Sequence, residues 1–194
     1  MGDALATRAT ALGQEREAPI TRQVLLRAAR QRFSLHGYAD VTLRDIAGEV
    51  GVSAALVVKY FGNKEALFAE AVSFEQEADL LLDAPLAALG EHLVRALLEL
   101  HEAAGSDPML RAVFTANRPG GARFRENFER QVVARLADRL PGVDPRLRAE
   151  LVCAQLIGLG ASRLALRSPR LSEQSPEALV ARYRPILQSL LDEA

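Results

Sequence analysis

Apolar residues recur at helical spacing along most of the chain, while strand patterns are nearly absent. Leu25, Ala29 and Phe33 lie four positions apart and predict one buried face of a helix over 21–36. Gly37 follows at the point where that helix is expected to end. No alternating run of Val, Ile and Thr is bounded by a hairpin turn. The pattern therefore predicts an all-α fold of about nine helices.

Two short helices are delimited by capping signals in the next part of the chain. Thr42, with Asp45 three positions later, is a variant of the capping box. Ser53 is placed to cap the second short helix, and Gly51 separates the two. Two capped short helices joined by a tight turn containing glycine describe a helix-turn-helix.

Longer helices are predicted for the rest of the chain, with Pro and Gly at their boundaries. Asn63 is expected to cap a continuous helix over 64–82. The later helices are expected over 86–104, 108–116, 122–140, 145–167 and 176–192. Pro185 falls inside the last of these and predicts a kink, because proline removes one backbone hydrogen bond.

Composition narrows the class of protein. The chain has 194 residues, of which 49% are hydrophobic, so it can bury a sizeable core. No run approaches the length of a membrane-spanning helix, and residues 1–19 lack the apolar core of a signal peptide, so we expect a disordered arm there. The single cysteine, Cys153, fits the reducing cytoplasm and is expected to be a small buried hydrophobe.

Charge is unevenly distributed along the chain. The net charge is −1, yet residues 19–66 hold seven Lys and Arg against four acids, and residues 67–194 hold 15 basic against 18 acidic residues. A basic module followed by an acidic one favours an anionic partner for the first module, such as nucleic acid.

Residues 20–68 resemble the TetR family of bacterial transcriptional regulators. The segment "LRAARQRFSLHGYADVTLRDIAGEVGVSAALVVKYFGNKEALF" has the family's order of helix, Gly-aromatic, Thr, "IA", "GVS", a terminal Phe and then Lys-Glu. The resemblance implies a three-helix DNA-binding domain over 20–66 and a helical ligand-binding and dimerisation domain over 67–194. It also implies a homodimeric repressor that a small ligand releases from a palindromic operator. The absence of Trp and the small number of polar residues inside the predicted helices favour a mainly apolar ligand.

The resemblance identifies 54–60 as the recognition helix in the DNA major groove. Its exposed face would then be small and apolar, which suits contacts with thymine methyl groups. Many family members have a polar residue at the position of Val58, so part of the specificity is expected to come from DNA shape. The expected base-facing residues are Ala54, Ala55, Leu56, Val58, Lys59 and Tyr60.

Phosphate contacts are expected at helix starts, where backbone N–H groups and the helix dipole attract anions. The expected residues are Thr42, Ser53, Lys64 and Arg44, with the Tyr60 hydroxyl as a further donor. Lys59 either contacts guanine or is a solvated surface lysine. Arg8 and Arg16 either enter the minor groove or belong to the disordered arm.

The resemblance also suggests where the second domain binds its partners. The last two helices are expected to form a four-helix interface with a second subunit, through Gly158, Ala161, Leu179, Tyr183, Ile186 and Leu190. Burial within one subunit is the alternative for each of them. The ligand pocket is expected to include Phe74, Phe114, Phe128 and Gln155, although Gln155 could instead face the neighbouring helix.

Enzymatic and metal-binding functions find little support in the sequence. No nucleophile–base pair or glycine-rich phosphate loop is present, so we expect no catalysis. His92 and His101 lack the i, i+4 spacing of helical metal ligands, and no metal or cofactor is expected. The main alternative function is a DNA-binding regulator that is constitutive or controlled by a protein partner.

Overall fold

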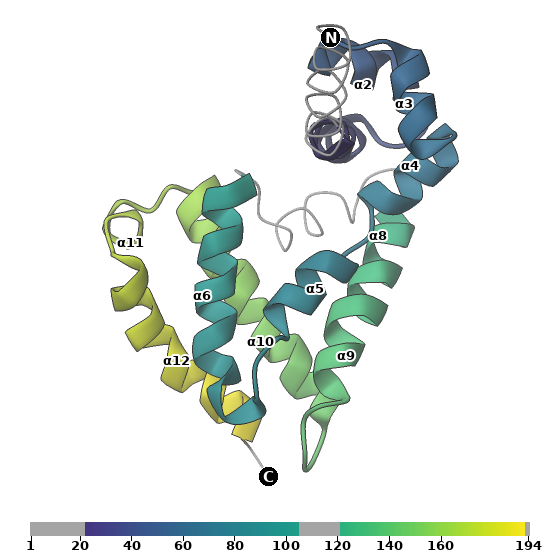
Figure 1. Cartoon of the computed structure of the whole chain (residues 1–194). Coiled ribbons are helices and arrows are strands. Elements are labelled where there is room, and N and C mark those ends of the chain that lie inside the picture. The colour runs from purple at the N-terminus through teal and green to yellow at the C-terminus, as the bar shows by residue number, and fades with distance from the viewer. Residues whose placement is uncertain (1–21, 105–120, 193–194) are drawn as a thin grey trace, which may run out of the picture. The chain divides into compact units, whose positions relative to one another are not determined.

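The computed structural model describes residues 22–104 and 121–192 (Figure 1). Every regular element in these ranges is a helix, which confirms the predicted all-α fold class. The predicted helix over 108–116, Phe114, and the arm with Arg8 and Arg16 lie outside the described residues. The chain divides into two compact units, Met1–Val72 and Ser73–Ala194.

The first unit contains a helix over residues 22–36, followed by α2 (Leu43–Val50), α3 (Ala54–Phe61) and α4 (Lys64–Ala71). The first helix ends at Gly37, which has a φ of 79° and donates its N–H to the Phe33 carbonyl. The predicted apolar face of this helix is buried and forms a core with apolar residues of the three later helices. This core includes Leu25, Ala29, Phe33, Ile46, Val57 and Leu67.

The caps of the short helices are those predicted from the sequence. Thr42 and Asp45 form a reciprocal capping box at the start of α2. Gly51 ends α2 with a φ of 78°, a left-handed conformation in which a Cβ would be strained. Ser53 accepts a hydrogen bond from the Leu56 N–H and so caps α3.

The predicted continuous helix over 64–82 is wrong. α4 ends at Ala71, and α5 (Glu75–Leu81) begins after a three-residue break. The Ser73 hydroxyl accepts the N–H of Glu75, a local bond that competes with helix formation. The N–H of Phe74 is bonded to the side chain of Gln131, 57 residues away. Both N–H groups therefore have partners that replace the helical ones.

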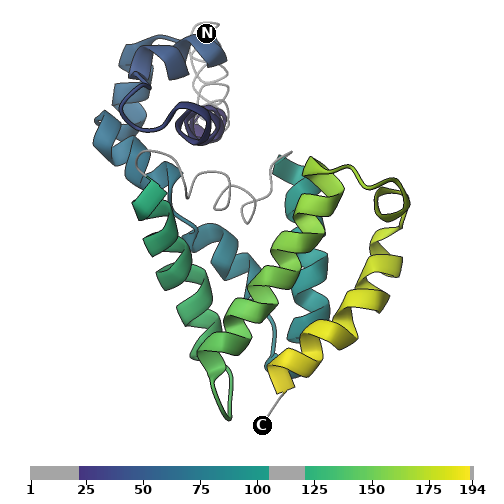
Figure 2. The same cartoon turned by 180° about the vertical axis from the view of Figure 1, so that it is seen from behind.

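The second unit is built around α6 (Leu86–Ala104) and α12 (Pro176–Asp192), whose bounds are those predicted. α12 packs mainly on α6, with α10 (Pro145–Gly160) beside it, as Figure 2 shows. Pro185 lies within α12 without ending it.

The other elements of the second unit correspond to the predicted helices over 122–140 and 145–167, with irregular turns. The first consists of α8 (Gly121–Phe128), a π-helical turn η1 (Glu129–Val133) and α9 (Ala134–Ala137). The second is α10 continued by the π-helical turn η2 (Ala161–Ala165). A short helix, α11 (Pro169–Ser172), was not predicted, because four residues are too few to show a helical period.

Candidate nucleic-acid interface

α3 buries one side and exposes the other as the sequence predicts. Val57 and Phe61 are buried in the core of the first unit, to which α3 belongs. Val58 is 46% exposed. Ala55 and Lys59 are also exposed, while Ala54, Leu56 and Tyr60 are half-buried.

The helix starts around α3 carry the polar residues expected to contact phosphates. Thr42 and Ser53 are exposed, and each accepts one N–H of its own helix through its hydroxyl oxygen. The other first-turn N–H groups of an α-helix have no partner within that helix. These starts can therefore both be capped and attract an anion.

Four cations of the first unit fall into two groups. Arg22 pairs with Glu70 at 2.7 Å and lies over the Phe61 ring, and Arg32 pairs with Glu49. These ion pairs link the first helix to α4 and to α2. Arg44 and Lys59 are exposed, and no ion pair within the described residues involves either of them. They are available to an anionic partner.

Lys64 occupies a defined position at the start of α4. Its ammonium nitrogen lies 4.3 Å from the centroid of the Tyr38 ring and 3.5 Å from the carbonyl oxygen of Ala39. The Tyr38 hydroxyl donates a hydrogen bond of 2.6 Å to the carboxylate of Glu65. Tyr38 was not among the predicted site residues, although the Gly-aromatic pair of the motif contains it.

The residues expected to line a ligand pocket are not all together. The Phe74 ring lies 5.6 Å from that of Phe128 and 6.4 Å from that of Phe124, measured between centroids. Phe74 is buried and Phe128 is half-buried. Gln155 is exposed on α10 and is not part of this ring cluster.

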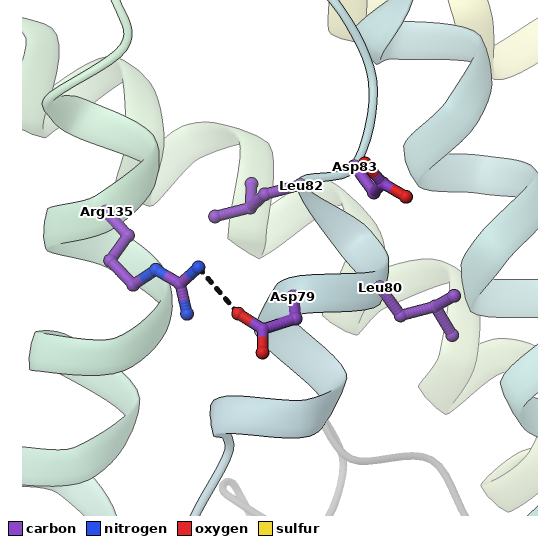
Figure 3. A pocket seen from close by; sticks show the side chains of 5 residues that line it. All are labelled: Asp79, Leu80, Leu82, Asp83 and Arg135. Carbon is purple, nitrogen blue, oxygen red and sulfur yellow. Dashed lines mark hydrogen bonds and ion pairs between the residues drawn. The ribbon is translucent and has the colours of Figure 1, made fainter.

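A separate, open depression of about 490 Å³ lies in the second unit. Figure 3 shows Arg135 and Asp79 pointing toward one another across it, at 2.8 Å. Arg135 also pairs with Glu75 at 3.3 Å. The lining of this depression is therefore largely charged and differs from the apolar pocket that the sequence suggests. The lining residues are Asp79, Leu80, Leu82, Asp83 and Arg135.

The predicted dimer residues differ in exposure. Leu179 is fully buried within the subunit, whereas Ile186 is exposed, and Ala161, Tyr183 and Leu190 are half-buried. Gly158 is exposed, with no heavy atom near the place where a Cβ would be. Two exposed leucines of α10, Leu147 and Leu151, were not predicted.

Three further findings concern a thiol, metal binding and membrane helices. Cys153 is buried, and burial raises the pKa of its thiol to about 12. No cluster of His, Cys, Asp and Glu suited to a metal ion is present in the described ranges. Among the helices described, none has both the length and the apolar character needed to cross a bilayer.

Comparison with known proteins identifies relatives for both units. A family model described as "Bacterial regulatory proteins, tetR family" matches residues 25–71. Another, described as "Tetracyclin repressor-like, C-terminal domain", matches residues 87–191.

Individual proteins show the same likeness. The chain is 46% identical over 54 residues to the HTH-type transcriptional regulator BetI of Agrobacterium fabrum, covering 28% of this chain and 26% of the relative. It is 30% identical over 127 residues to the HTH-type transcriptional repressor SCO4008 of Streptomyces coelicolor, covering 61% of this chain and 65% of the relative. The chain thus spans between about a quarter and two thirds of the length of these relatives.

A solved structure extends the likeness over most of the fold. The TetR-family regulator SCO0857 from Streptomyces coelicolor A3 is 26% identical, with a TM-score of 0.52, over 88% of this chain and 94% of that one. The matching C-terminal family model alone covers more than half of the chain. The chain therefore belongs to the tetR family of bacterial regulatory proteins.

Proposed function

We propose that the protein is a sequence-specific DNA-binding transcriptional regulator that represses by occupying an operator. The observation that carries this proposal is the exposed, small and apolar face of α3, centred on Ala55 and Val58 and placed between capped helix starts. Such a face is unfavourable against water but suits the floor of a major groove. The names of the curated relatives, a regulator and a repressor, support the same function.

In this proposal α3 lies in the major groove. Ala54, Ala55 and Val58 allow a close approach and contact thymine methyl groups. Lys59 donates to a guanine edge. Thr42, Ser53 and the exposed Arg44 contact phosphates and fix the register of the helix without reading sequence.

The proposed regulator is a homodimer, since a palindromic operator requires two α3 helices in successive major grooves, about 34–36 Å apart. An apolar stripe on α10 supports a second subunit. Leu147, Leu151, Ala154 and Gly158 follow one another at spacings of four, three and four, and all are exposed. This spacing places them on one face of the helix. Ile186 adds an exposed apolar side chain from α12, which packs beside α10.

A small, mainly apolar ligand is the proposed inducer. Phe74 lies in the break between α4 and α5, at the start of the second unit, and its ring centroid is 5.6 Å from that of Phe128 in α8. A ligand that displaces these two rings would act on the segment that joins the two units. This segment occupies the place where the sequence predicts a continuous helix. It induces only if it binds the DNA-competent conformation more weakly. Moving occupancy from 99:1 to 1:99 requires about 5.5 kcal/mol of differential affinity. A protein that acts on operator DNA in this way works in the cytoplasm.

The test is enrichment of a duplex from a random-sequence pool by the full-length protein. We expect one palindromic sequence to be enriched and bound by a dimer. Ala55→Glu should abolish that binding, because a carboxylate in the groove faces bases and phosphates. The fold should tolerate it, since an acid in the first turn of a helix interacts well with the dipole.

The matched control is Ala69→Glu, the same change at an exposed position of α4. It should leave the affinity near that of wild type. Equal losses in the two variants, or a wild-type protein that enriches no sequence, would contradict the proposed function.

A further inference from the structure

Tyr38 lies in the turn after the first helix and is anchored by two buried aromatic residues. Its ring centroid is 6.2 Å from that of Phe33 and 4.8 Å from that of Phe68. Phe33 and Phe68 also contact one another edge to face, at 5.0 Å. The orientation of the Tyr38 ring is thus set by the core of the first unit.

This ring holds the ammonium group of Lys64. The distance of 4.3 Å to the ring centroid is well within the 6 Å at which a cation is attracted by an aromatic face. The Ala39 carbonyl, 3.5 Å away, takes a second direction around the ammonium. An ammonium group has three donors, so it can still donate to a further acceptor. A lysine held in this way loses less rotamer freedom when it binds a phosphate.

The hydroxyl of Tyr38 holds the carboxylate of Glu65. Glu65 follows Lys64 directly, and its carboxylate accepts the Tyr38 hydroxyl at 2.6 Å. This hydrogen bond is the main reason why the pKa of Glu65 is lowered, so the carboxylate is ionised and fixed. Without the hydroxyl, Glu65 would be free to pair with Lys64 or to approach and repel a phosphate.

We propose that Tyr38 is a positioning residue for DNA binding. Its ring keeps the Lys64 ammonium ready for a DNA phosphate at the start of α4, and its hydroxyl keeps Glu65 away from that phosphate. Tyr38 itself acts through these two neighbours and contacts no base. The inference rests on the proposed function and adds Tyr38 to the residues on which DNA binding depends.

The decisive experiment is a double-mutant cycle between Tyr38→Leu and Lys64→Ala, measured on the full-length dimer. The DNA is the duplex that the wild-type protein enriches from a random-sequence pool, titrated over a salt series. Lys64→Ala should reduce the slope of log K against log salt by about 0.9 for each phosphate that is no longer neutralised. Tyr38→Leu should weaken binding about fivefold or more per dimer, and its slope should move toward that of Lys64→Ala.

The cycle separates positioning from a structural effect. Every protein of the cycle carries Glu65→Gln, so that only the effect through Lys64 is measured. In the Lys64→Ala background, Tyr38→Leu should then cost less than about twofold, because the lysine through which the ring acts is gone. An equal loss in both backgrounds would mean that Tyr38 only supports the fold, and would overturn the proposal. Lys59→Ala is the matched control, since Lys59 is a lysine of α3 outside this cluster. Its effect should combine additively with that of Tyr38→Leu.

A conservative variant distinguishes the two parts of the residue. Tyr38→Phe keeps the ring and should keep the coupling to Lys64. It frees Glu65, so any loss of affinity should be reversed by adding Glu65→Gln. A Tyr38→Phe protein that behaves like Tyr38→Leu in the cycle would contradict a role for the ring.

Nuclear magnetic resonance of the DNA-free protein tests the geometry separately from the function. The Hε protons of Lys64 should show an upfield ring-current shift in wild type and Tyr38→Phe, and ordinary shifts in Tyr38→Leu. Ordinary shifts in wild type would overturn the inference even if the protein binds DNA. If the shifts are upfield but the protein enriches no duplex, the geometry around Tyr38 is correct and the proposed function is wrong.

Discussion

The side chain of Gln188 in α12 is hydrogen-bonded to the backbone of α6 at Gly90, where the two helices meet. Its Oε1 accepts the Gly90 N–H at 2.9 Å, and its Nε2 donates to the carbonyl of Leu86 at 3.0 Å. Leu86 and Gly90 are four residues apart, the spacing of partners in an α-helical hydrogen bond. The amide therefore joins the two main helices of the second unit through backbone groups.

Replacing Gly90 by alanine should destabilise the protein. A Cβ there would lie 2.9 Å from the Gln188 backbone nitrogen and 3.1 Å from the Arg184 carbonyl oxygen. These backbone atoms cannot move without shifting α12, and overpacking of this kind costs about 1–3 kcal/mol. Urea unfolding of Gly90→Ala and wild type measures the loss.

Gly48→Ala is the matched control for that experiment. Gly48 is a glycine of α2, and nothing lies within 4 Å of the position that a Cβ would take there. An alanine in a helix interior is favoured over glycine by about 0.5–1 kcal/mol, so this variant should be slightly more stable than wild type. If Gly90→Ala were as stable as Gly48→Ala, the close approach of α6 and α12 would be wrong.

The capping box of α2 should make stability depend on pH through Asp45. Its carboxylate accepts hydrogen bonds from the Thr42 hydroxyl and the Thr42 N–H, which lower the pKa of Asp45. A carboxyl whose pKa is lower in the folded state adds stability above its unfolded pKa of about 3.9. That contribution is lost as the pH falls through the folded value.

The measurement compares wild type with Asp45→Asn, which can still accept a hydrogen bond but does not titrate. The urea midpoints of both proteins are measured between pH 7 and pH 2.5. Wild type should have the higher midpoint at neutral pH, and the difference between the two midpoints should disappear below about pH 4. All other carboxyl groups are common to both proteins and cancel in the difference. A gap that stays constant over this range would exclude the proposed role of the ionised side chain.

Leu151→Glu should convert the proposed dimer into monomers. Leu151 is 41% exposed in the subunit and lies in the middle of the apolar stripe of α10. Two such carboxylates would be buried or would face each other across a symmetric interface, and an unpaired buried charge is costly. Light scattering measures the mass of the protein in solution as it leaves a size-exclusion column. Val143→Glu, at a loop residue that is 78% exposed, is the control and should remain dimeric. A dimeric Leu151→Glu protein would exclude this face of α10 as the interface.

The thiol of Cys153 should be unreactive in the native protein. It is 3% exposed, and burial raises its pKa to about 12, so hardly any thiolate is present at pH 8. The thiolate is the reactive species. Mass spectrometry should find no adduct with iodoacetamide at pH 8 in buffer and complete labelling in urea. Rapid labelling of the native protein would show that α10 opens readily.

The elements that could be predicted from the sequence are those whose signals are local. Thr42, Ser53 and Gly51 act within three or four residues of themselves, and the predicted caps and turn are all present. The inward side of α3 was also predictable, because Val57 and Phe61 are spaced for one face. The exposure of Val58 follows from the same spacing.

The elements that were missed depend on residues far apart in the chain. The break after α4 is held by Gln131, which is 57 residues from Phe74. Tyr38 meets Lys64 only when the first helix and α4 pack together. Leu179 is apolar like Ile186, yet one is buried within the subunit and the other is exposed. Only the packing of α12 on α6 separates them.

The break between α4 and α5 has a consequence for how such regulators could be recombined. A junction at the peptide bond between Val72 and Ser73 keeps the Arg22–Glu70 ion pair in one piece and the Phe74–Gln131 hydrogen bond in the other. Both interactions would survive if the neighbouring unit were exchanged. The same three-residue segment that interrupts the helix thus marks the splice point at which an operator specificity could be transplanted onto a different sensor.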